Sequence, residues 1–253
     1  MAKKFYVVWQ GRETGIFTDW ETCKKHVDQF AGARYKSFKT QQEAETAFNG
    51  KSNPSSKAAS TKKTSSSSAV KTYAADEISS MPINSKIFTD GACVPNPGKA
   101  GTGVAIYRNN IIKELWYGLY NPNGTNNTAE LNGLNQALII AKDELAKGQS
   151  VAIFCDSKYS IQCITQWAIG WQKKGWIKKG GEIKNLELIK EIFTRYQLLK
   201  DSVQILHVNG HVGVEGNELA DRMSMVAIET QELDFSLYRN ELDIPTLLAM
   251  RAG

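Results

Sequence analysis

The first 49 residues alternate short apolar, β-prone runs with turn and helix-cap residues. Thr18 and Thr40 are each followed by a glutamate three positions later, the spacing of a capping box, so each is expected to begin a short helix. The apolar runs predict three strands, over residues 5–10, 16–17 and 33–38. Residues 1–49 are therefore predicted to form a small α/β domain of order ββαβα.

Composition changes sharply over residues 50–82, where Ser, Lys, Ala and Thr dominate. Few of these side chains could be buried, so folding would not offset their conformational entropy. We expect a flexible linker, which would tether two domains and raise the local concentration of one near a partner held by the other.

The pattern from residue 83 onward predicts a larger α/β domain. A β-prone run that ends at Asp90 and two further runs, which the turn residues Asn109 and Asn110 separate, predict an antiparallel meander. A fully apolar run over residues 151–156 is typical of a buried parallel strand. Further elements are expected as helices over about 128–147, 157–169 and 183–199, a strand over 203–208 and a helix from near 216.

This order of elements predicts an α/β fold for residues 83–230, with a mixed five-stranded sheet flanked by helices. The tail over residues 231–253 mixes acidic residues with Leu and Phe. It carries no recognisable chemistry, and its pattern is compatible both with a short helix and with a loosely ordered segment.

The overall composition is that of a globular chain. Hydrophobic residues make up 42% of the 253, and no apolar run approaches the roughly 20 residues needed to span a bilayer. The N-terminus lacks the apolar core of a secretory signal. The four cysteines have no Cys-x-x-Cys spacing, which favours free thiols in a reducing cytosol over a zinc site or disulfides. We therefore expect a cytoplasmic protein with no membrane partner.

The net charge of +5 is concentrated near the N-terminus. Residues 1–82 carry thirteen Lys and Arg against eight Asp and Glu, whereas residues 83–253 carry eighteen of each. An excess of positive charge in one part of a chain suggests that this part holds a polyanionic partner.

Four acidic residues lie where strands are predicted to end or helices to begin. Asp90 and Asp156 each end an apolar run, Glu130 lies in the first turn of the long helix, and Asp221 lies near the start of the last helix. An isolated Asp–Gly pair such as Asp90–Gly91 usually starts a hairpin turn. However, the carboxyl ends of parallel strands meet at one edge of a sheet, where sites of α/β proteins form.

Four carboxylates gathered at such an edge would repel one another unless cations neutralised them. Ligand sets made only of oxygen suit Mg²⁺ or Mn²⁺ rather than zinc. A pair of such ions could flank a phosphodiester and activate a water molecule for its hydrolysis.

Four short motifs around these acids occur in the order of the type I ribonuclease H signature. They are Thr89-Asp90-Gly91-Ala92-Cys93, Thr128-Ala129-Glu130-Leu131, Phe154-Cys155-Asp156-Ser157, and His207-Val208-Asn209-Gly210-His211 with Gly213, Gly216, Asn217-Glu218, Ala220 and Asp221. Over about residues 84–229 the chain therefore resembles this family. The resemblance implies the ribonuclease H fold.

The implied activity is that of an endoribonuclease that cuts the RNA strand of RNA–DNA hybrids and leaves 5′-phosphate and 3′-hydroxyl ends. By the same resemblance the chain would use two Mg²⁺ ions, for which Mn²⁺ can substitute. We expect no small-molecule cofactor and a monomeric chain. The implied metal ligands are Asp90, Glu130, Asp156 and Asp221.

His211 lies between glycines, which suggests a mobile loop where an imidazole could relay protons near neutral pH. A lone histidine is more often structural. At this spacing the resemblance implies a catalytic helper in proton transfer or product release, whose loss would slow the reaction less than loss of a carboxylate.

The resemblance also identifies nucleic-acid contacts in the larger domain, which must sense a 2′-hydroxyl on one strand and its absence on the other. Positions that face RNA ribose groups or bases in the family correspond to Cys93, Asn96 and Asn127. Positions near the DNA strand, where relatives have a phosphate pocket, correspond to Thr125, Asn126 and Asn185.

Residues 166–179 interleave three tryptophans with four lysines, a pattern typical of a surface that faces nucleic acid. The segment resembles the basic protrusion of bacterial and animal ribonucleases H. The implied contacts are Trp171, Lys173, Lys174 and Trp176. The alternative is an amphipathic helix with packed tryptophans and a solvated lysine face. The two interpretations are compatible if Trp167 and Trp171 belong to the core while the lysines face DNA.

The N-terminal domain resembles the hybrid-binding domain of cellular type I ribonucleases H, which is related to viroplasmin. The resemblance rests on the run from Phe5 to Trp20 and on Ala33-Arg34-Tyr35-Lys36. It implies nucleic-acid contacts by Tyr6, Arg12, Trp20, Tyr35 and Lys36. Exposed aromatic rings would stack on bases while the cations bind phosphates; the alternative places Trp20 and Tyr35 in the core. The family's second lysine in this motif is Ser37 here, so one phosphate contact is missing.

Two other functions are compatible with parts of this pattern. A DNA-cutting recombinase or integrase also gathers carboxylates around metals, but the glycine-rich loop and the N-terminal domain argue against it. A non-catalytic hybrid-binding protein or RNA chaperone would be favoured by a missing carboxylate, and all four are present.

Overall fold

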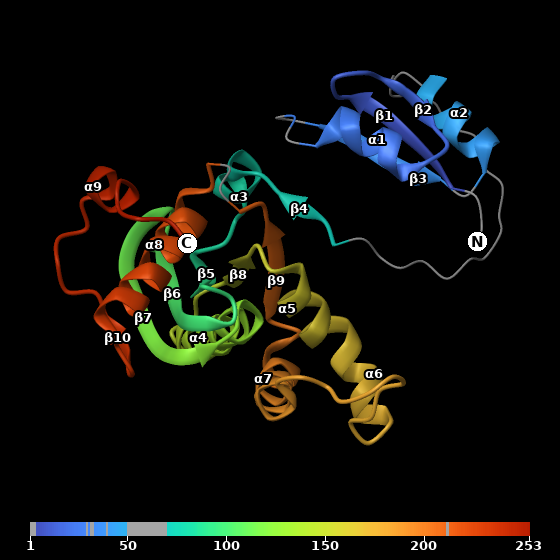
Figure 1. Cartoon of the computed structure of the whole chain (residues 1–253). Coiled ribbons are helices and arrows are strands. Elements are labelled where there is room, and N and C mark those ends of the chain that lie inside the picture. The colour runs from blue at the N-terminus through green and yellow to red at the C-terminus, as the bar shows by residue number, and fades with distance from the viewer. Residues whose placement is uncertain (1–3, 29, 31–32, 39, 50–69, 211–212) are drawn as a thin grey trace. The chain divides into compact units, whose positions relative to one another are not determined.

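The structure is a computed structural model that describes residues 4–28, 30, 33–38, 40–49, 70–210 and 213–253. The chain divides into two compact units, residues 1–66 and 67–253 (Figure 1). Residues 50–69, which make up most of the predicted linker, lie outside the described residues.

The N-terminal unit has the predicted order ββαβα. Its three-stranded sheet has the order β2-β1-β3, with both outer strands antiparallel to β1. The elements are β1 (Phe5–Gln10), β2 (Gly15–Phe17), α1 (Trp20–Val27), β3 (Arg34–Phe38) and α2 (Gln41–Asn49). Asp19, not Thr18, caps α1, because its carboxylate accepts a 2.8 Å hydrogen bond from the backbone N–H of Thr22. Val8, Cys23 and Val27 form the small core.

The larger unit contains the predicted meander. Its strands β5 (Ser85–Val94), β6 (Gly98–Arg108) and β7 (Ile111–Gly124) pair in antiparallel fashion. Asn109 and Asn110 both have positive φ angles, 52° and 61°, as a tight hairpin turn between two twisted strands requires. Two buried strands then extend the sheet in parallel: β8 (Val151–Cys155) beside β5, and β9 (Val203–Val208) beside β8.

Two short strands lengthen the expected five-stranded sheet to seven, in the order β10-β7-β6-β5-β8-β9-β4. At one edge β4 (Thr72–Tyr73) runs parallel to β9, and at the other β10 (Phe235–Leu237) runs antiparallel to β7. Helix α3 (Ala75–Ser80) follows β4, and its Ile78 is buried. The prediction of a flexible linker is therefore wrong for residues 72–80: their composition is polar, but they pack against partners distant in sequence.

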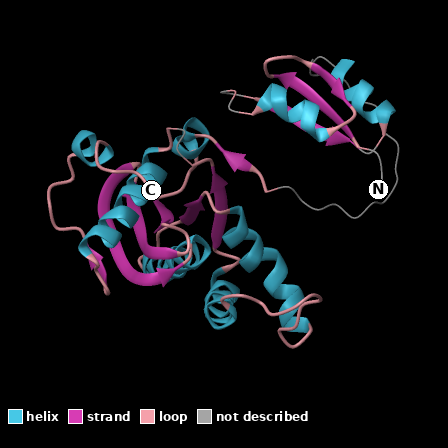
Figure 2. Ribbon diagram, in the orientation of Figure 1, coloured by secondary structure: helices cyan, strands magenta, loops and turns pink. Residues whose placement is uncertain are grey.

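Helices cover both faces of the sheet (Figure 2). One core includes Ile87, Leu134 and Ile189 beneath α4 (Asn126–Ala146) and α7 (Leu186–Leu199); the other includes Phe88 and Leu219 beneath α8 (Glu215–Thr230). The remaining helical segments are α5 (Lys158–Gln162), a π-helical turn (Cys163–Trp167), α6 (Ala168–Lys173) and α9 (Ile244–Leu248). No helix in the described part of the chain is long and apolar enough to cross a membrane.

An ion-pair cluster around the buried Glu144 fixes α4 to the hairpin of β6 and β7. The Glu144 side chain is only 1% exposed and accepts hydrogen bonds from Arg108 Nε at 3.0 Å, Arg108 Nη2 at 2.9 Å and Lys147 Nζ at 2.9 Å. Arg108 also pairs with Glu114 at 2.7 Å. The donated hydrogen bond from Arg108 lowers the pKa of Glu144 to about 2.

Candidate active site

Three of the four predicted acids converge on one point of the larger unit. Asp90 comes from β5, Glu130 from the first turns of α4, and Asp156 from the residue after β8. One carboxylate oxygen from each lies within 4.8 Å of the other two, which makes a group that could hold a metal ion. The topology is responsible, because the parallel pairing of β5 and β8 carries Asp90 and Asp156 to the same end of the sheet.

The sequence suggested that Asp90 ends its strand, but the structure places it within the strand. Strand β5 continues for four residues to Val94, and Asp90 pairs with Gly103 in the interior of the ladder. The Asp90–Gly91 pair is thus no hairpin turn. Gly91 is needed for a close approach, since a Cβ at this position would lie 2.3 Å from the backbone nitrogen of Glu130. The glycine therefore lets the start of α4 pack directly against β5 and brings Glu130 beside Asp90.

Burial and mutual repulsion make these carboxylates hard to ionise. Asp90 is 6% exposed and Glu130 is 7% exposed. Desolvation, followed by the charges of Asp156 and Asp221, raises the pKa of Asp90 well above its ordinary value. Desolvation, followed by the charges of Asp90 and Asp156, does the same to the pKa of Glu130. Without a cation, the group would retain protons that the isolated side chains would lose.

Asn217 and Gly210 lie against Asp156. Both belong to the sequence motif, but the sequence offers no reason to assign them a role. Asn217 is buried in α8, and its Nδ2 donates to Asp156 Oδ2 at 3.3 Å. Gly210 backs the same carboxylate so closely that a Cβ there would lie 2.4 Å from Oδ2. The buried Oδ1 of Asn217 has no hydrogen-bond partner among the described residues. An acceptor is thus left beside the acids, where a water molecule or a hydrated cation could use it.

Asp221, the fourth predicted ligand, lies next to the group but outside the 4.8 Å cluster that the described residues form. It is 3% exposed, and its charge acts on Asp90. Its Oδ2 accepts a short hydrogen bond from Arg222, and its Oδ1 accepts one from the backbone N–H of Gly253 at 3.0 Å. The tail, to which the sequence assigned no role, therefore reaches the site and engages one of its acids.

All four acids line one cavity of about 170 Å³. Three predicted nucleic-acid contacts lie on or next to its wall. Cys93 and Asn126 line the cavity, and Asn96 Oδ1 accepts a hydrogen bond from the N–H of Asn126 at 3.3 Å. Asn127 is exposed in the first turn of α4, which begins earlier than the pattern predicted.

The predicted DNA-side contacts meet at the N-terminus of α4. Thr125 is the N-cap and accepts a hydrogen bond from the N–H of Thr128. The hydroxyl of Thr128 in turn donates to Asn185 Oδ1 at 3.1 Å. Asn185 has a left-handed backbone, with φ at 58°, immediately before α7. Residues 60 positions apart in sequence thus form one polar cluster.

Trp171 and Trp176 of the predicted basic protrusion pack, whereas Trp167 and most of the lysines are exposed. Trp171 packs against the core beneath α4 and α7, and the Trp176 ring lies 5.9 Å edge-on from Phe193. Lys173 and Lys174 are exposed. The alternative of packed tryptophans with a solvated lysine face therefore holds for Trp171, but the expectation that Trp167 belongs to the core is wrong, because Trp167 is 38% exposed.

The N-terminal unit brings three predicted contact residues into one aromatic row. The Trp20 ring lies 5.5 Å from Tyr6 and 5.8 Å from Tyr35, and Trp20 and Tyr35 are 39% and 46% exposed. Lys36 is exposed on the same strand as Tyr35. Arg12 has a structural contact: its Nη1 donates to the carbonyl oxygens of Lys25 and Asp28 at the end of α1.

His211 lies outside the described residues, together with Val212. The structure therefore does not test its predicted role as a catalytic helper. The next residue, Gly213, has φ at 79°, and its N–H donates to Glu218 Oε1 at 2.9 Å.

Comparison with known proteins bears on both units. Residues 83–229 match the RNase H family, and residues 4–48 match the family described as the ribonuclease H1 N-terminal domain. Ribonuclease H1 of Mus musculus is 29% identical over 262 residues, which cover 90% of this chain and 90% of the relative. Ribonuclease H of Pseudomonas savastanoi pv. phaseolicola is 37% identical over 145 residues, which cover 57% of this chain and 92% of the relative.

Solved structures share the fold of the larger unit. LC9-RNase H1, described as a type 1 RNase H with the type 2 active-site motif, superposes with a TM-score of 0.52 at 24% identity, covering 68% of this chain and 87% of its own. A foamy viral protease-reverse transcriptase in complex with an RNA/DNA hybrid also has a TM-score of 0.52, at 20% identity, covering 67% of this chain and 22% of its own.

A mixed sheet whose strands and first long helix gather carboxylates in one cavity defines a protein of the ribonuclease H fold. The chain belongs to the ribonuclease H family, as the match over residues 83–229 shows. It is a ribonuclease H of type I with a ribonuclease H1 N-terminal domain.

Proposed function

We propose that the protein is an endoribonuclease that hydrolyses the RNA strand of RNA–DNA hybrids with the help of two Mg²⁺ ions, for which Mn²⁺ can substitute. The products would carry 5′-phosphate and 3′-hydroxyl ends. The observation that carries this proposal is the convergence of Asp90, Glu130 and Asp156 within 4.8 Å in a cavity that Asp221 also lines.

The residues at this site fit divalent ions that prefer oxygen ligands. The acids supply only carboxylate oxygens, the donor set that Mg²⁺ and Mn²⁺ favour. Burial, followed by mutual repulsion, raises the pKa values of Asp90 and Glu130, and a bound cation would offset both effects. The proposed ligands are Asp90, Glu130, Asp156 and Asp221; when bound, the metals would activate a water molecule and stabilise the leaving oxygen.

The chain's own groups orient these ligands. The N–H of Gly91 donates to Asp90 Oδ1 at 2.7 Å, and Asn217 holds Asp156 Oδ2. Each bond fixes the position of one carboxylate oxygen. We further propose that His211 assists proton transfer or product release from its loop, as the motif implies.

Recognition of the hybrid is proposed to come from three surfaces. Cys93, Asn96 and Asn127 would contact the RNA strand near the cavity. The cluster at the start of α4, Thr125, Asn126 and Asn185, would bind the DNA strand, with Lys173, Lys174 and the adjacent Trp171 and Trp176 beside it. Phosphate contacts of this kind supply affinity, and ribose contacts supply discrimination.

The N-terminal domain, residues 1–49, is proposed to grip the hybrid through the aromatic row of Tyr6, Trp20 and Tyr35, with Lys36 and Arg12 binding phosphates. Two exposed rings side by side suit stacking on bases or sugars. A hybrid held by this domain would remain at a high local concentration near the catalytic domain. The catalytic domain comprises residues 83–230 together with the packed segment 72–80.

We also propose that the protein is monomeric, uses no small-molecule cofactor and is located in the cytoplasm. The four cysteines are all free thiols, which supports a reducing compartment.

The test is cleavage of end-labelled RNA–DNA hybrid in Mg²⁺, with double-stranded RNA and double-stranded DNA of the same sequence alongside. We expect internal cuts in the RNA of the hybrid only, with 5′-phosphate ends, and none by Asp90→Asn. Tight hybrid binding without cleavage by the wild type would refute the proposal and leave a binding protein. Cleavage of double-stranded DNA would favour a recombinase-like enzyme.

A further inference from the structure

The segment over residues 72–80 lies outside the RNase H match, which begins at residue 83, yet it is built into the catalytic unit. It contributes an edge strand, β4, and a helix, α3, to that unit. It also connects the N-terminal domain to the catalytic unit along the chain. Whether this connection can affect the active site therefore depends on the contacts of residues 72–80.

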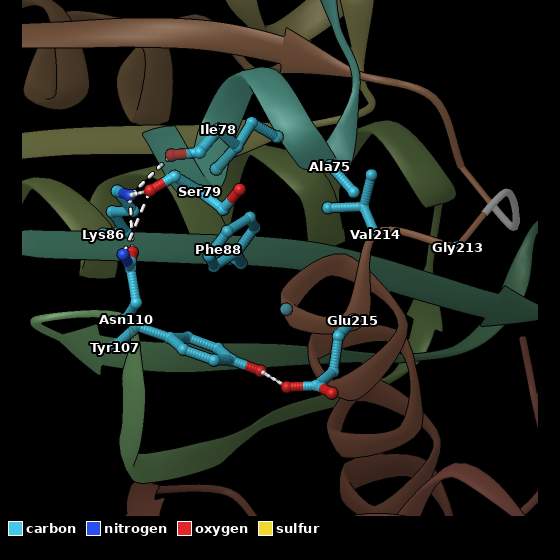
Figure 3. A pocket seen from close by; sticks show the side chains of 11 residues that line it. Ala75, Ile78, Ser79, Lys86, Phe88, Tyr107, Asn110, Gly213, Val214 and Glu215 are labelled. Carbon is cyan, nitrogen blue, oxygen red and sulfur yellow. Dashed lines mark hydrogen bonds between the residues drawn. The ribbon is translucent and has the colours of Figure 1, made fainter. Parts of the chain in front are cut away.

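A buried lysine anchors α3. Lys86 in β5 is 2% exposed, and its Nζ donates to the carbonyl oxygens of Ile78 at 2.5 Å and Ser79 at 3.3 Å and to Asn110 Oδ1 at 2.6 Å. Figure 3 shows these three hydrogen bonds meeting at the ammonium group. An ammonium has three N–H donors, so this one is fully satisfied by the helix end and the hairpin turn. Carbonyl oxygens at a helix C-terminus also favour a nearby cation.

Strand β4 reaches the strand next to the catalytic acids. Thr72 is in register with His207 of β9, and the two side chains meet, with Thr72 Oγ1 2.8 Å from His207 Nδ1. His207 is 3% exposed and Thr72 is half-buried. On its other side, His207 Nε2 lies 3.1 Å from the backbone oxygen of Asp156.

The partners of the imidazole determine where its proton lies. The oxygen of Asp156 can only accept, so Nε2 must carry the hydrogen and donate it. In the neutral ring Nδ1 is then an acceptor, and the Thr72 hydroxyl donates to it. The oxygen of Asp156 thus sets the tautomer, and the Thr72 hydroxyl supplies the donor that Nδ1 needs in this tautomer.

Hydrogen bonds hold Asp156 at both its backbone and its side chain. Its backbone oxygen accepts from His207 and from the N–H of Lys158, the latter at 3.1 Å, and its carboxylate accepts from Asn217. Because β8 ends at Cys155, the backbone of Asp156 has left the ladder, and these bonds replace strand pairing there.

We propose that Thr72 is a positioning residue: through His207 it holds the backbone of Asp156, so that the segment leading from the N-terminal domain helps to build the metal site. The inference rests on the proposed role of Asp156 as a metal ligand. Outer partners of metal ligands commonly affect metal affinity even though they never touch the ion.

The test uses three full-length variants. Thr72→Val keeps the shape of the side chain and removes the hydroxyl, and Thr72→Ser keeps the hydroxyl. Lys71→Ala, at the residue before this segment, is a control whose ammonium contacts Glu77 and Tyr73 instead of His207. The readouts are Mn²⁺ binding by calorimetry, the ring ¹⁵N shifts of the histidines, the melting temperature, and kcat and KM for hybrid cleavage.

We expect Thr72→Val to weaken Mn²⁺ binding by about three- to tenfold, below the usual range for a residue that contacts a ligand directly. Its kcat at limiting metal should fall while KM for the hybrid stays constant, and the ¹⁵N shift of His207 Nδ1 should change because that nitrogen loses its hydrogen-bond donor. Thr72→Ser should restore all three, and Lys71→Ala should equal the wild type.

A Thr72→Val variant that equals the wild type in Mn²⁺ affinity and in histidine shifts overturns this inference alone. A loss that Thr72→Ser does not restore, or that follows the melting temperature in all three variants, also overturns it, because it would reflect packing of β4. A wild type that binds no Mn²⁺ overturns the proposed function instead.

Discussion

Replacing Asp90 by Asn should have opposite effects on stability and on catalysis. The substitution keeps the size of the side chain and the acceptor oxygen for the N–H of Gly91, which lies 2.7 Å away. It removes one of three carboxylates whose oxygens lie within 4.8 Å of one another. Without metal the variant should therefore be more stable than the wild type, although it should not cleave the hybrid.

The size of the effect follows from the spacing. Two unit charges 4.8 Å apart repel by about 3 kcal/mol at an effective dielectric constant of about 20. Burial has raised the pKa values of Asp90 and Glu130, so the group lowers this repulsion by retaining protons, and the net cost is smaller. We expect Asp90→Asn to stabilise the metal-free catalytic unit by about 1–3 kcal/mol, or roughly 2–4 °C in melting temperature for each kcal/mol.

The assay is thermal unfolding of wild type and variant, each in EDTA and in Mg²⁺. Under the proposed function Mg²⁺ binds only the folded site, so it should raise the melting temperature of the wild type in proportion to the logarithm of its concentration. The variant should start higher in EDTA and gain less from Mg²⁺. Arg195→Ala, which removes an exposed ion pair with Glu191 on α7, is a control that should respond to Mg²⁺ as the wild type does.

Two results would refute this reasoning. If Asp90→Asn melts below the wild type in EDTA, the carboxylate forms favourable contacts that outweigh repulsion. If both proteins gain equally from Mg²⁺, the ion binds elsewhere.

Three further predictions concern other parts of the chain. Glu144→Gln should lose about 2–3 kcal/mol of stability at pH 7, because folding lowers the pKa of Glu144 from 4.5 to about 2. In denaturant titrations this difference between wild type and variant should vanish as the pH falls through that interval. A difference that does not depend on pH would contradict the prediction. A chain that ends at Met250 loses the hydrogen bond from Gly253 to Asp221, so half-maximal cleavage should need a few-fold less Mg²⁺. An unchanged Mg²⁺ requirement would show that the tail does not affect metal binding. Trp20→Ala should weaken hybrid binding by about tenfold in anisotropy titrations without changing kcat at saturation, and unaltered affinity would remove the aromatic row from the interface.

The sequence by itself determined the order of the central elements and the identity of the central acids. Apolar runs such as residues 151–156 and the turn at Asn109–Asn110 are local signals, because a buried strand and a left-handed turn each select their residues within a few positions. Asp90, Glu130 and Asp156 could be grouped in advance because parallel strands and a crossover helix bring such positions together.

Tertiary structure alone decided what packs at the sheet edges and what surrounds each acid. Residues 72–80 have a polar, linker-like composition, and the buried Lys86, 8 residues from Ile78 in sequence, is what anchors them. Likewise Asn217 is 61 residues from Asp156, and Gly253 is 32 residues from Asp221. Local propensity carries no information about such contacts, since their energy depends on burial that exists only once the sheet has formed.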